Sequence, residues 1–98
     1  MADILQEVRG FEWDEGNSGK SEKKHGVTDR EAEEIFFNEP LLIARSARGG
    51  DEVRYAALGK TLGSRLLTAI FTLRSKRIRV ISARPMSRRE RETYEKET

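Results

Sequence analysis

The sequence predicts an α+β domain: two N-terminal helices, an antiparallel sheet of about four strands, and a short C-terminal helix. Two capping-box motifs, one near each end of the chain, predict helices there. Between them, short apolar stretches alternate with polar residues and are separated by glycine-containing turns, which is typical of strands. The 98 residues are enough for one domain, so residues 1–98 are expected to form a single unit.

The first helix is predicted over residues 15–24. Asp14 can cap its start and Gly26 can end it, although Gly16 and Gly19 weaken it. Just before it, residues 11–13 resemble a short strand or an anchored segment, with two aromatic side chains on the same side.

The second helix is predicted to begin at a capping box formed by Thr28 and Glu31. Its apolar positions, Ala32 and Ile35 among them, recur at helical spacing, and Pro40 ends it.

Four strands are predicted after Pro40, over residues 41–44, 53–59, 66–73 and 77–84. Turns are predicted at residues 48–51 and 62–64, and the short connections favour antiparallel hairpins. Alternation in the last strand places Ile78, Val80 and Ser82 on one face and Arg77, Arg79, Ile81 and Ala83 on the other.

The C-terminal helix is predicted from a second capping box, formed by Ser87 and Glu90, with Pro85 just before it. It is expected to continue through Tyr94.

Composition limits the chemistry that the chain can perform. It has no cysteine and one histidine, which excludes disulfides, a thiolate metal site and a histidine-rich metal site, so no cofactor is expected. The N-terminus lacks the pattern of a signal peptide, and no apolar run is long enough to span a membrane. We therefore expect a cytoplasmic protein without a membrane partner.

Charge is unevenly distributed along the chain. Residues 1–50 carry seven Lys and Arg against eleven Asp and Glu, whereas residues 51–98 carry twelve against six. Such a basic half suits a polyanion, because arginine can donate two hydrogen bonds to one phosphate. A solvated face, or a docking surface for an acidic protein, would explain it equally well.

Lys24 and His25 lie at the predicted end of the first helix, where the helix dipole favours cations. They could simply bind the free carbonyl groups there. Alternatively, they could bind a phosphate or protonate a leaving oxygen, since histidine is a common general acid.

Glu52 and Arg54 are two residues apart in a predicted strand and therefore project from the same face. Glu52 could serve as a general base and Arg54 could bind a phosphate. A solvated salt bridge is the alternative. Arg77 and Arg79, with Arg84 at the strand end, could bind an anion or dock an acidic helix.

RNA cleavage by attack of a 2′-hydroxyl needs a base, cations at the phosphate and an acid for the 5′-oxygen. The side chains above offer all three without a metal, but spacing alone does not show that they converge.

The sequence resembles the BrnT toxin family from residue 11 to residue 95. The matching segments are Phe11-Glu12-Trp13-Asp14, Lys24-His25-Gly26-Val27, Glu31-Ala32-Glu33-Glu34-Ile35-Phe36, Asn38-Glu39-Pro40, Glu52-Val53-Arg54-Tyr55, Ala57-Leu58-Gly59, Arg65-Leu66-Leu67, Phe71-Thr72-Leu73-Arg74, Ile78-Arg79-Val80-Ile81-Ser82-Ala83-Arg84 and Ser87-Arg88-Arg89-Glu90-Arg91 with Tyr94. The block from Ile78 to Arg84 is the most specific of them.

The resemblance implies a RelE-like fold and a metal-independent endoribonuclease that inhibits translation. It also implies neutralisation by a BrnA-type antitoxin, which would supply the contact with operator DNA. The family's polar positions correspond to Lys24, His25, Glu52, Arg54, Arg65 and Arg84, which become the candidate catalytic residues. Arg77, Arg79 and Arg88 are the candidate RNA-binding residues.

Two positions depart from the family pattern. Ser21 stands where the family usually has Asn, which could weaken a side-chain hydrogen bond near the site. Ser64 stands where Gly commonly precedes the arginine of the third strand, which changes a hairpin. Neither departure removes a candidate catalytic group.

Three functions remain open from the sequence: an endoribonuclease, a non-catalytic module that binds a partner protein, and a regulator that binds nucleic acid without cutting it. The arrangement of Lys24, His25, Glu52 and Arg84, in one cleft or scattered, discriminates between the first two.

Overall fold

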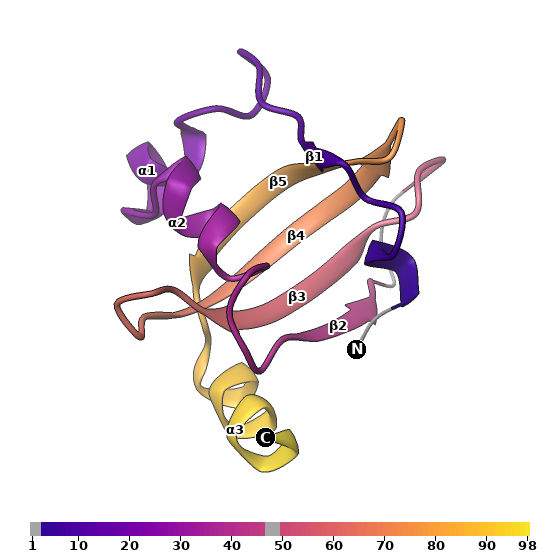
Figure 1. The fold of residues 1–98 in the computed structure, drawn as a ribbon. Coiled ribbons are helices and arrows are strands. Elements are labelled where there is room, and N and C mark those ends of the chain that lie inside the picture. Colours follow the sequence, from indigo (N-terminus) through magenta and orange to yellow (C-terminus); the bar gives the residue numbers. More distant parts are fainter. Residues whose placement is uncertain (1–2, 47–49) are drawn as a thin grey trace.

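The computed structural model describes residues 3–46 and 50–98 and confirms the α+β class. Its elements are η1 (Asp3–Leu5), β1 (Gly10–Phe11), α1 (Lys20–His25), α2 (Asp29–Glu34), β2 (Leu42–Arg45), β3 (Tyr55–Lys60), β4 (Leu66–Arg74), β5 (Arg77–Pro85) and α3 (Arg88–Glu97). Figure 1 shows a twisted sheet with α1 and α2 together near one end of it and α3 apart from them.

The five strands lie in the order β1-β5-β4-β3-β2. Strands β2 to β5 form the predicted antiparallel series, because their short connections allow only neighbouring, antiparallel pairing. The predicted segment at Phe11 is a two-residue strand that pairs with β5 in parallel. The sheet is therefore mixed, with one strand more than the sequence predicts.

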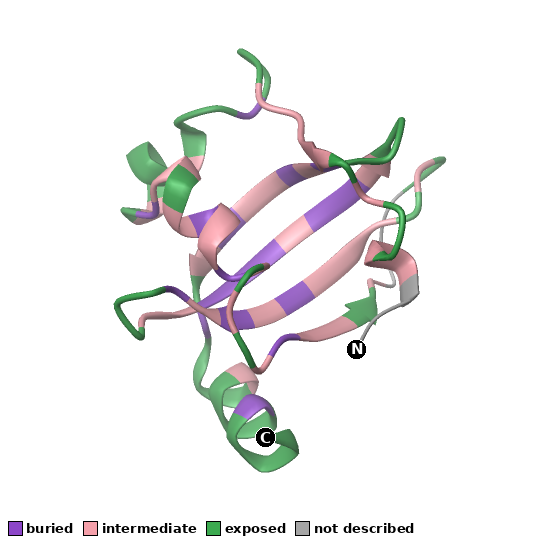
Figure 2. Ribbon diagram, viewed as in Figure 1, coloured by how far each residue is buried: buried purple, intermediate pink, exposed green. Residues whose placement is uncertain are grey.

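The two faces of the sheet differ in what covers them. On the inner face, α2 and the segment before it place Val27, Ala32 and Ile35 in one core cluster with inward-facing strand residues such as Leu67 and Phe71. The strand residues that alternate with these project from the outer face, and α3 lies against one part of that face. Figure 2 shows buried residues concentrated on β3, β4 and β5, whereas α3 is mostly exposed.

Close packing of α2 on the sheet depends on Gly59 in β3. A Cβ atom at this position would lie 3.0 Å from Ile35 Cβ and 3.2 Å from the Ile35 carbonyl oxygen. Real Cβ atoms rarely approach so closely, so any side chain here would push α2 away from the sheet.

The first helix starts later than the sequence predicts, at Lys20. Asp14 holds a turn instead: its carboxylate accepts a hydrogen bond from the Gly16 N–H at 2.7 Å, and its carbonyl accepts one from Ser18. Gly19 then has a positive φ of 75°, which interrupts a helix. The predicted end is confirmed, because Gly26 caps α1 with φ of 71°.

Both predicted capping boxes are present. Thr28 and Glu31 exchange side-chain to backbone hydrogen bonds at the start of α2, and Ser87 and Glu90 do the same at the start of α3. Helix α3 continues to Glu97, one turn beyond the predicted end at Tyr94.

The predicted alternation in β5 is wrong beyond Val80. A register shift opposite Ile70 and Phe71 inserts an extra residue into β5, so that Val80 pairs with Phe71 while Ser82 pairs with Ile70. As a result Ala83 is buried on the inner face, and Ser82 and Arg84 project from the outer face. The sequence does not predict this bulge, because the alternation of apolar and polar residues does not show where an extra residue is inserted.

The hairpin turns contain residues with left-handed backbone. Ser75 and Lys76, which join β4 to β5, have φ of 50° and 65°, as a two-residue type I′ turn requires. The predicted turn at residues 62–64 is confirmed, and Ser64 there has φ of 68°. In the predicted turn at residues 48–51, residues 48 and 49 lie outside the described residues.

Candidate active site

Charged side chains gather on the outer face where β4 and β5 meet in their hairpin. Arg74 donates two hydrogen bonds to the Glu52 carboxylate, at 2.8 and 3.0 Å. Arg79 donates to Glu12 at 3.0 Å and to both carboxylate oxygens of Asp14, at 2.9 and 3.0 Å. With Arg54, described below, these residues form what we call the hairpin-end cluster: Glu12, Asp14, Glu52, Arg54, Arg74 and Arg79.

Ion pairing in this cluster keeps Asp14 and Glu52 charged. The hydrogen bond from Arg74 lowers the pKa of Glu52 below its usual value, with smaller contributions from the charges of Arg54 and Arg79. Bonding to Arg79 lowers the pKa of Asp14 in the same way. Glu52 is therefore an ionised proton acceptor at neutral pH. It forms a salt bridge with Arg74 of β4, and not with Arg54.

Arg54 differs from the other arginines of the cluster. Arg74 and Arg79 bind the three carboxylates between them, and Arg54 takes part in none of those bonds. Within residues 3–46 and 50–98, its Nε is the one buried side-chain nitrogen or oxygen without a hydrogen-bond partner. Such a donor is costly to leave unpaired. The Nε itself is closed to solvent, but the half-buried Arg54 is the one arginine of the cluster that holds no carboxylate.

The other candidates lie at the opposite end of the sheet. Arg65, just before β4, donates to the Gly26 carbonyl at 2.9 Å and to both oxygens of Glu31 at 3.1 Å. This contact holds the end of α1 and the start of α2 beside the start of β4. Lys24 and His25 complete the last turn of α1, with Lys24 exposed and His25 half-buried.

Arg84 fastens α3 to the sheet. It donates two hydrogen bonds to Glu90, at 2.6 and 2.8 Å, and the hydroxyl of Thr68 donates a third at 2.9 Å. The Arg84 side chain is the main reason why the pKa of Glu90 falls to about 2. Since Glu90 also closes the capping box of α3, one carboxylate joins helix and strand.

Arg77 and Arg88 are exposed. Arg77 begins β5 beside the hairpin-end cluster, whereas Arg88 begins α3.

The six candidate catalytic residues thus fall into separate groups. Arg65 and Arg74 lie just before and at the end of β4, and nine residues at about 3.3 Å each separate their backbones by roughly 30 Å. Glu52 and Arg54 belong to the Arg74 end, while Lys24 and His25 belong to the Arg65 end. One phosphodiester group cannot contact both ends at once.

The departure at Ser21 has a structural consequence. Its hydroxyl oxygen accepts a hydrogen bond at 2.9 Å from the Ala83 N–H, on the β5 edge that β1 leaves uncovered. The smaller side chain therefore keeps a backbone contact between α1 and the sheet.

Sequence reasoning missed Glu12, Asp14 and Arg74 as members of a charged site. Glu12 and Asp14 are two residues apart, which places them on the same side of an extended segment, but nothing local indicates that β1 joins the edge of β5. In the described part of the chain, no group of three or more His, Cys, Asp or Glu residues could hold a metal ion.

Among residues 3–46 and 50–98, no helix has the length and apolar character that a membrane-spanning helix requires.

The geometry defines a small α+β domain whose open sheet face carries the three arginines of the hairpin-end cluster, two of them paired with three carboxylates. Residues 13–90 match the family model described as the BrnT ribonuclease toxin of a type II toxin–antitoxin system. This covers most of the 98 residues, and the chain belongs to that family. No curated protein matches the chain.

Proposed function

We propose that the chain is a metal-independent endoribonuclease that cleaves RNA at the hairpin-end cluster. The observation that carries the proposal is Arg54, a half-buried arginine that holds no carboxylate and lies two residues from an ionised Glu52. An RNA phosphate would be an acceptor for this guanidinium group, because arginine binds phosphate oxygens with charge-assisted hydrogen bonds.

The reaction needs no group that the chain lacks. Glu52 accepts the proton of a 2′-hydroxyl, whose oxygen attacks the adjacent phosphorus, and the bond from phosphorus to the 5′-oxygen breaks. Arg54 and Arg74 stabilise the charge that develops on the phosphate. The cluster lies on the open outer face, so the leaving 5′-oxygen can take its proton from water, and the hydroxide that remains takes the proton that Glu52 accepted. The products are a 2′,3′-cyclic phosphate and a 5′-hydroxyl.

Roles for the remaining candidates follow from their positions. Arg79, within the cluster, and Arg77 beside it would bind neighbouring phosphates. Lys24 and His25, at the far end of the sheet, would contact RNA several nucleotides away instead of acting as the acid. Arg65 and Arg84 are held by Glu31 and Glu90, and they position α2 and α3 against the sheet.

The biological setting is proposed from the family. Cleavage of mRNA would inhibit translation, so we expect the activity in the cytoplasm. An antitoxin of the BrnA type would neutralise the toxin. We predict that the chain contacts operator DNA only through that antitoxin.

The test is cleavage of single-stranded RNA by the purified chain in excess EDTA. We expect wild type to produce 2′,3′-cyclic phosphate ends, and E52Q and R54Q to lose at least 100-fold in rate. R91Q, an exposed arginine of α3 outside the cluster, is the matched control and should cleave like wild type. Folded wild type that leaves RNA intact, or cleavage by R54Q at the wild-type rate, would overturn the proposal in favour of a binding module.

A further inference from the structure

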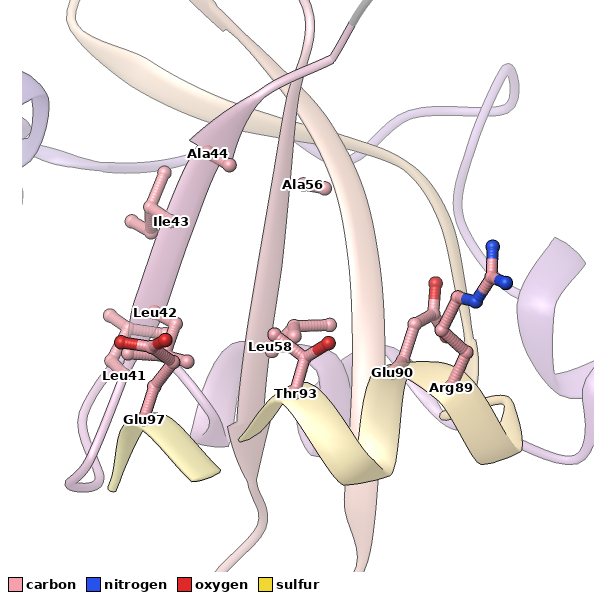
Figure 3. Close-up of a pocket in the computed structure, with 10 residues that line it drawn as sticks. All are labelled: Leu41, Leu42, Ile43, Ala44, Ala56, Leu58, Arg89, Glu90, Thr93 and Glu97. Atoms are coloured by element: carbon pink, nitrogen blue, oxygen red, sulfur yellow. The ribbon is translucent and has the colours of Figure 1, made fainter. Parts of the chain in front are cut away.

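An open apolar groove lies between α3 and the outer face of β2 and β3. Its volume is about 720 Å³, and its floor and wall include Leu42, Ala44, Ala56, Leu58, Thr93 and Glu97. Figure 3 shows the leucines and alanines on the strands, with Thr93 and Glu97 on the helix that flanks them.

Helix α3 leaves this apolar floor uncovered. The wall it presents to the groove consists of polar side chains, including Thr93 and Glu97. Its buried residue, Tyr94, instead donates its hydroxyl hydrogen bond to the Pro40 carbonyl. The apolar strand side chains therefore have no apolar partner on α3, although burying them would be favourable.

The floor has the spacing that a helix fits. Leu42 is paired with Leu58 and Ala44 with Ala56, so that two rows of apolar side chains cross neighbouring strands. Successive rows on one strand face are about 6.6 Å apart, close to the separation of side chains three or four residues apart on a helix. The small alanines leave room for larger side chains of a partner.

The groove leads to the unpaired arginine. Arg54, Ala56 and Leu58 are alternate residues of one chain segment, so Arg54 is the next side chain along the same face. Its Nε lacks a partner, while the other arginines of the hairpin-end cluster are paired. A partner that complements this surface is apolar where it lies over the groove. It carries a carboxylate at Arg54, which is roughly 13 Å along the chain from Leu58.

We propose that the antitoxin binds here through an amphipathic helix whose apolar side fills the groove and whose carboxylate binds Arg54. At 1.5 Å per residue, the acidic residue lies about nine positions from the apolar side chain that contacts Leu58. This inference rests on the proposed function, because the carboxylate neutralises the toxin by occupying the donor that would otherwise bind the RNA phosphate.

Binding of the antitoxin, purified from its complex with this chain, tests the proposal. A44K places a charge on the floor at an exposed position, so the fold should tolerate it. We expect A44K to bind the antitoxin at least tenfold more weakly and to cleave RNA like wild type. The matched control is L62K, at a leucine that is 72 % exposed in the β3–β4 turn, outside the groove. It should bind and cleave like wild type.

A second measurement does not depend on affinity. A photo-reactive phenylalanine analogue placed at position 44 should cross-link to the antitoxin, and the same analogue at position 62 should not. Wild-type affinity of A44K together with no cross-link from position 44 would overturn the proposal. Reduced RNA cleavage by A44K would assign the groove to RNA, and a stable dimer of the free chain that A44K dissociates would assign it to a second copy.

These experiments distinguish a failure of the ribonuclease proposal from a failure of the antitoxin-binding proposal. A wild-type chain that binds antitoxin through the groove but leaves RNA intact would refute only the ribonuclease proposal.

Discussion

The contact between Arg84 and Glu90 makes a quantitative prediction for the variant E90Q. Glutamine keeps an oxygen that can accept hydrogen bonds from Ser87 and Thr68, so the variant removes mainly the charge. The pKa of Glu90 falls from 4.5 to about 2, a difference of about 2.5. At about 1.36 kcal/mol per pKa unit, this sets a ceiling of about 3.4 kcal/mol on the stabilisation.

Solvent reduces this ceiling. The side chains of Arg84 and Glu90 are 35 % and 26 % exposed, so water screens part of the interaction. We expect E90Q to lower the free energy of unfolding by about 1–2 kcal/mol at pH 7, and the melting temperature by roughly 5–10 °C.

The effect should depend on pH in a defined direction. Because folding lowers the pKa of Glu90, the stabilisation is complete above the unfolded value of 4.5 and is lost as pH falls toward about 2. Urea unfolding of wild type and E90Q should therefore differ less than half as much at pH 3 as at pH 7.

The control is E92Q, which changes an exposed glutamate of the same helix. It should unfold like wild type at both pH values. If E90Q were as stable as wild type at pH 7, or equally destabilised at pH 7 and pH 3, the charge on Glu90 would not join α3 to the sheet.

Three further substitutions test the backbone. S64G should stabilise the chain by about 0.5–1 kcal/mol, because Ser64 has φ of 68°; a lower melting temperature would contradict this. G59A should destabilise it by about 1–3 kcal/mol in urea unfolding, since the new Cβ would crowd Ile35; unchanged stability would show that α2 can move away freely. S21A should cost about 1–2 kcal/mol and speed hydrogen exchange at the Ala83 amide, whose acceptor it removes; unchanged exchange would refute the contact.

Local signals explain which parts of the fold could be predicted. Each capping box lies within four residues of sequence, and both occur in the structure. The hairpin strands were also predictable, since their apolar alternation and short connections are local. The parallel pairing of β1 was not, because its partner in β5 is more than 60 residues away.

Only part of the candidate site was predictable as residues, and its arrangement was not. Glu52 and Arg54 both belong to the hairpin-end cluster, but they precede β3, which begins at Tyr55, so the strand predicted to hold them starts later. Their distance from His25 depends on the length and direction of β4. The bulge in β5 moved Ala83 to the inner face, and Arg84 to the outer one. Ion pairs such as Arg79 with Asp14 join residues 65 positions apart, so no local pattern reveals them.

The use of the capping-box glutamates as arginine ligands has a consequence for the order of folding. Helices α1 and α2 have six residues each and α3 has ten, lengths at which an isolated helix is marginal in water. Glu31 and Glu90 complete their contacts only when Arg65 and Arg84 are already in place at the ends of β4 and β5. The hairpins close short loops and can form early, so the helices should consolidate late and open first.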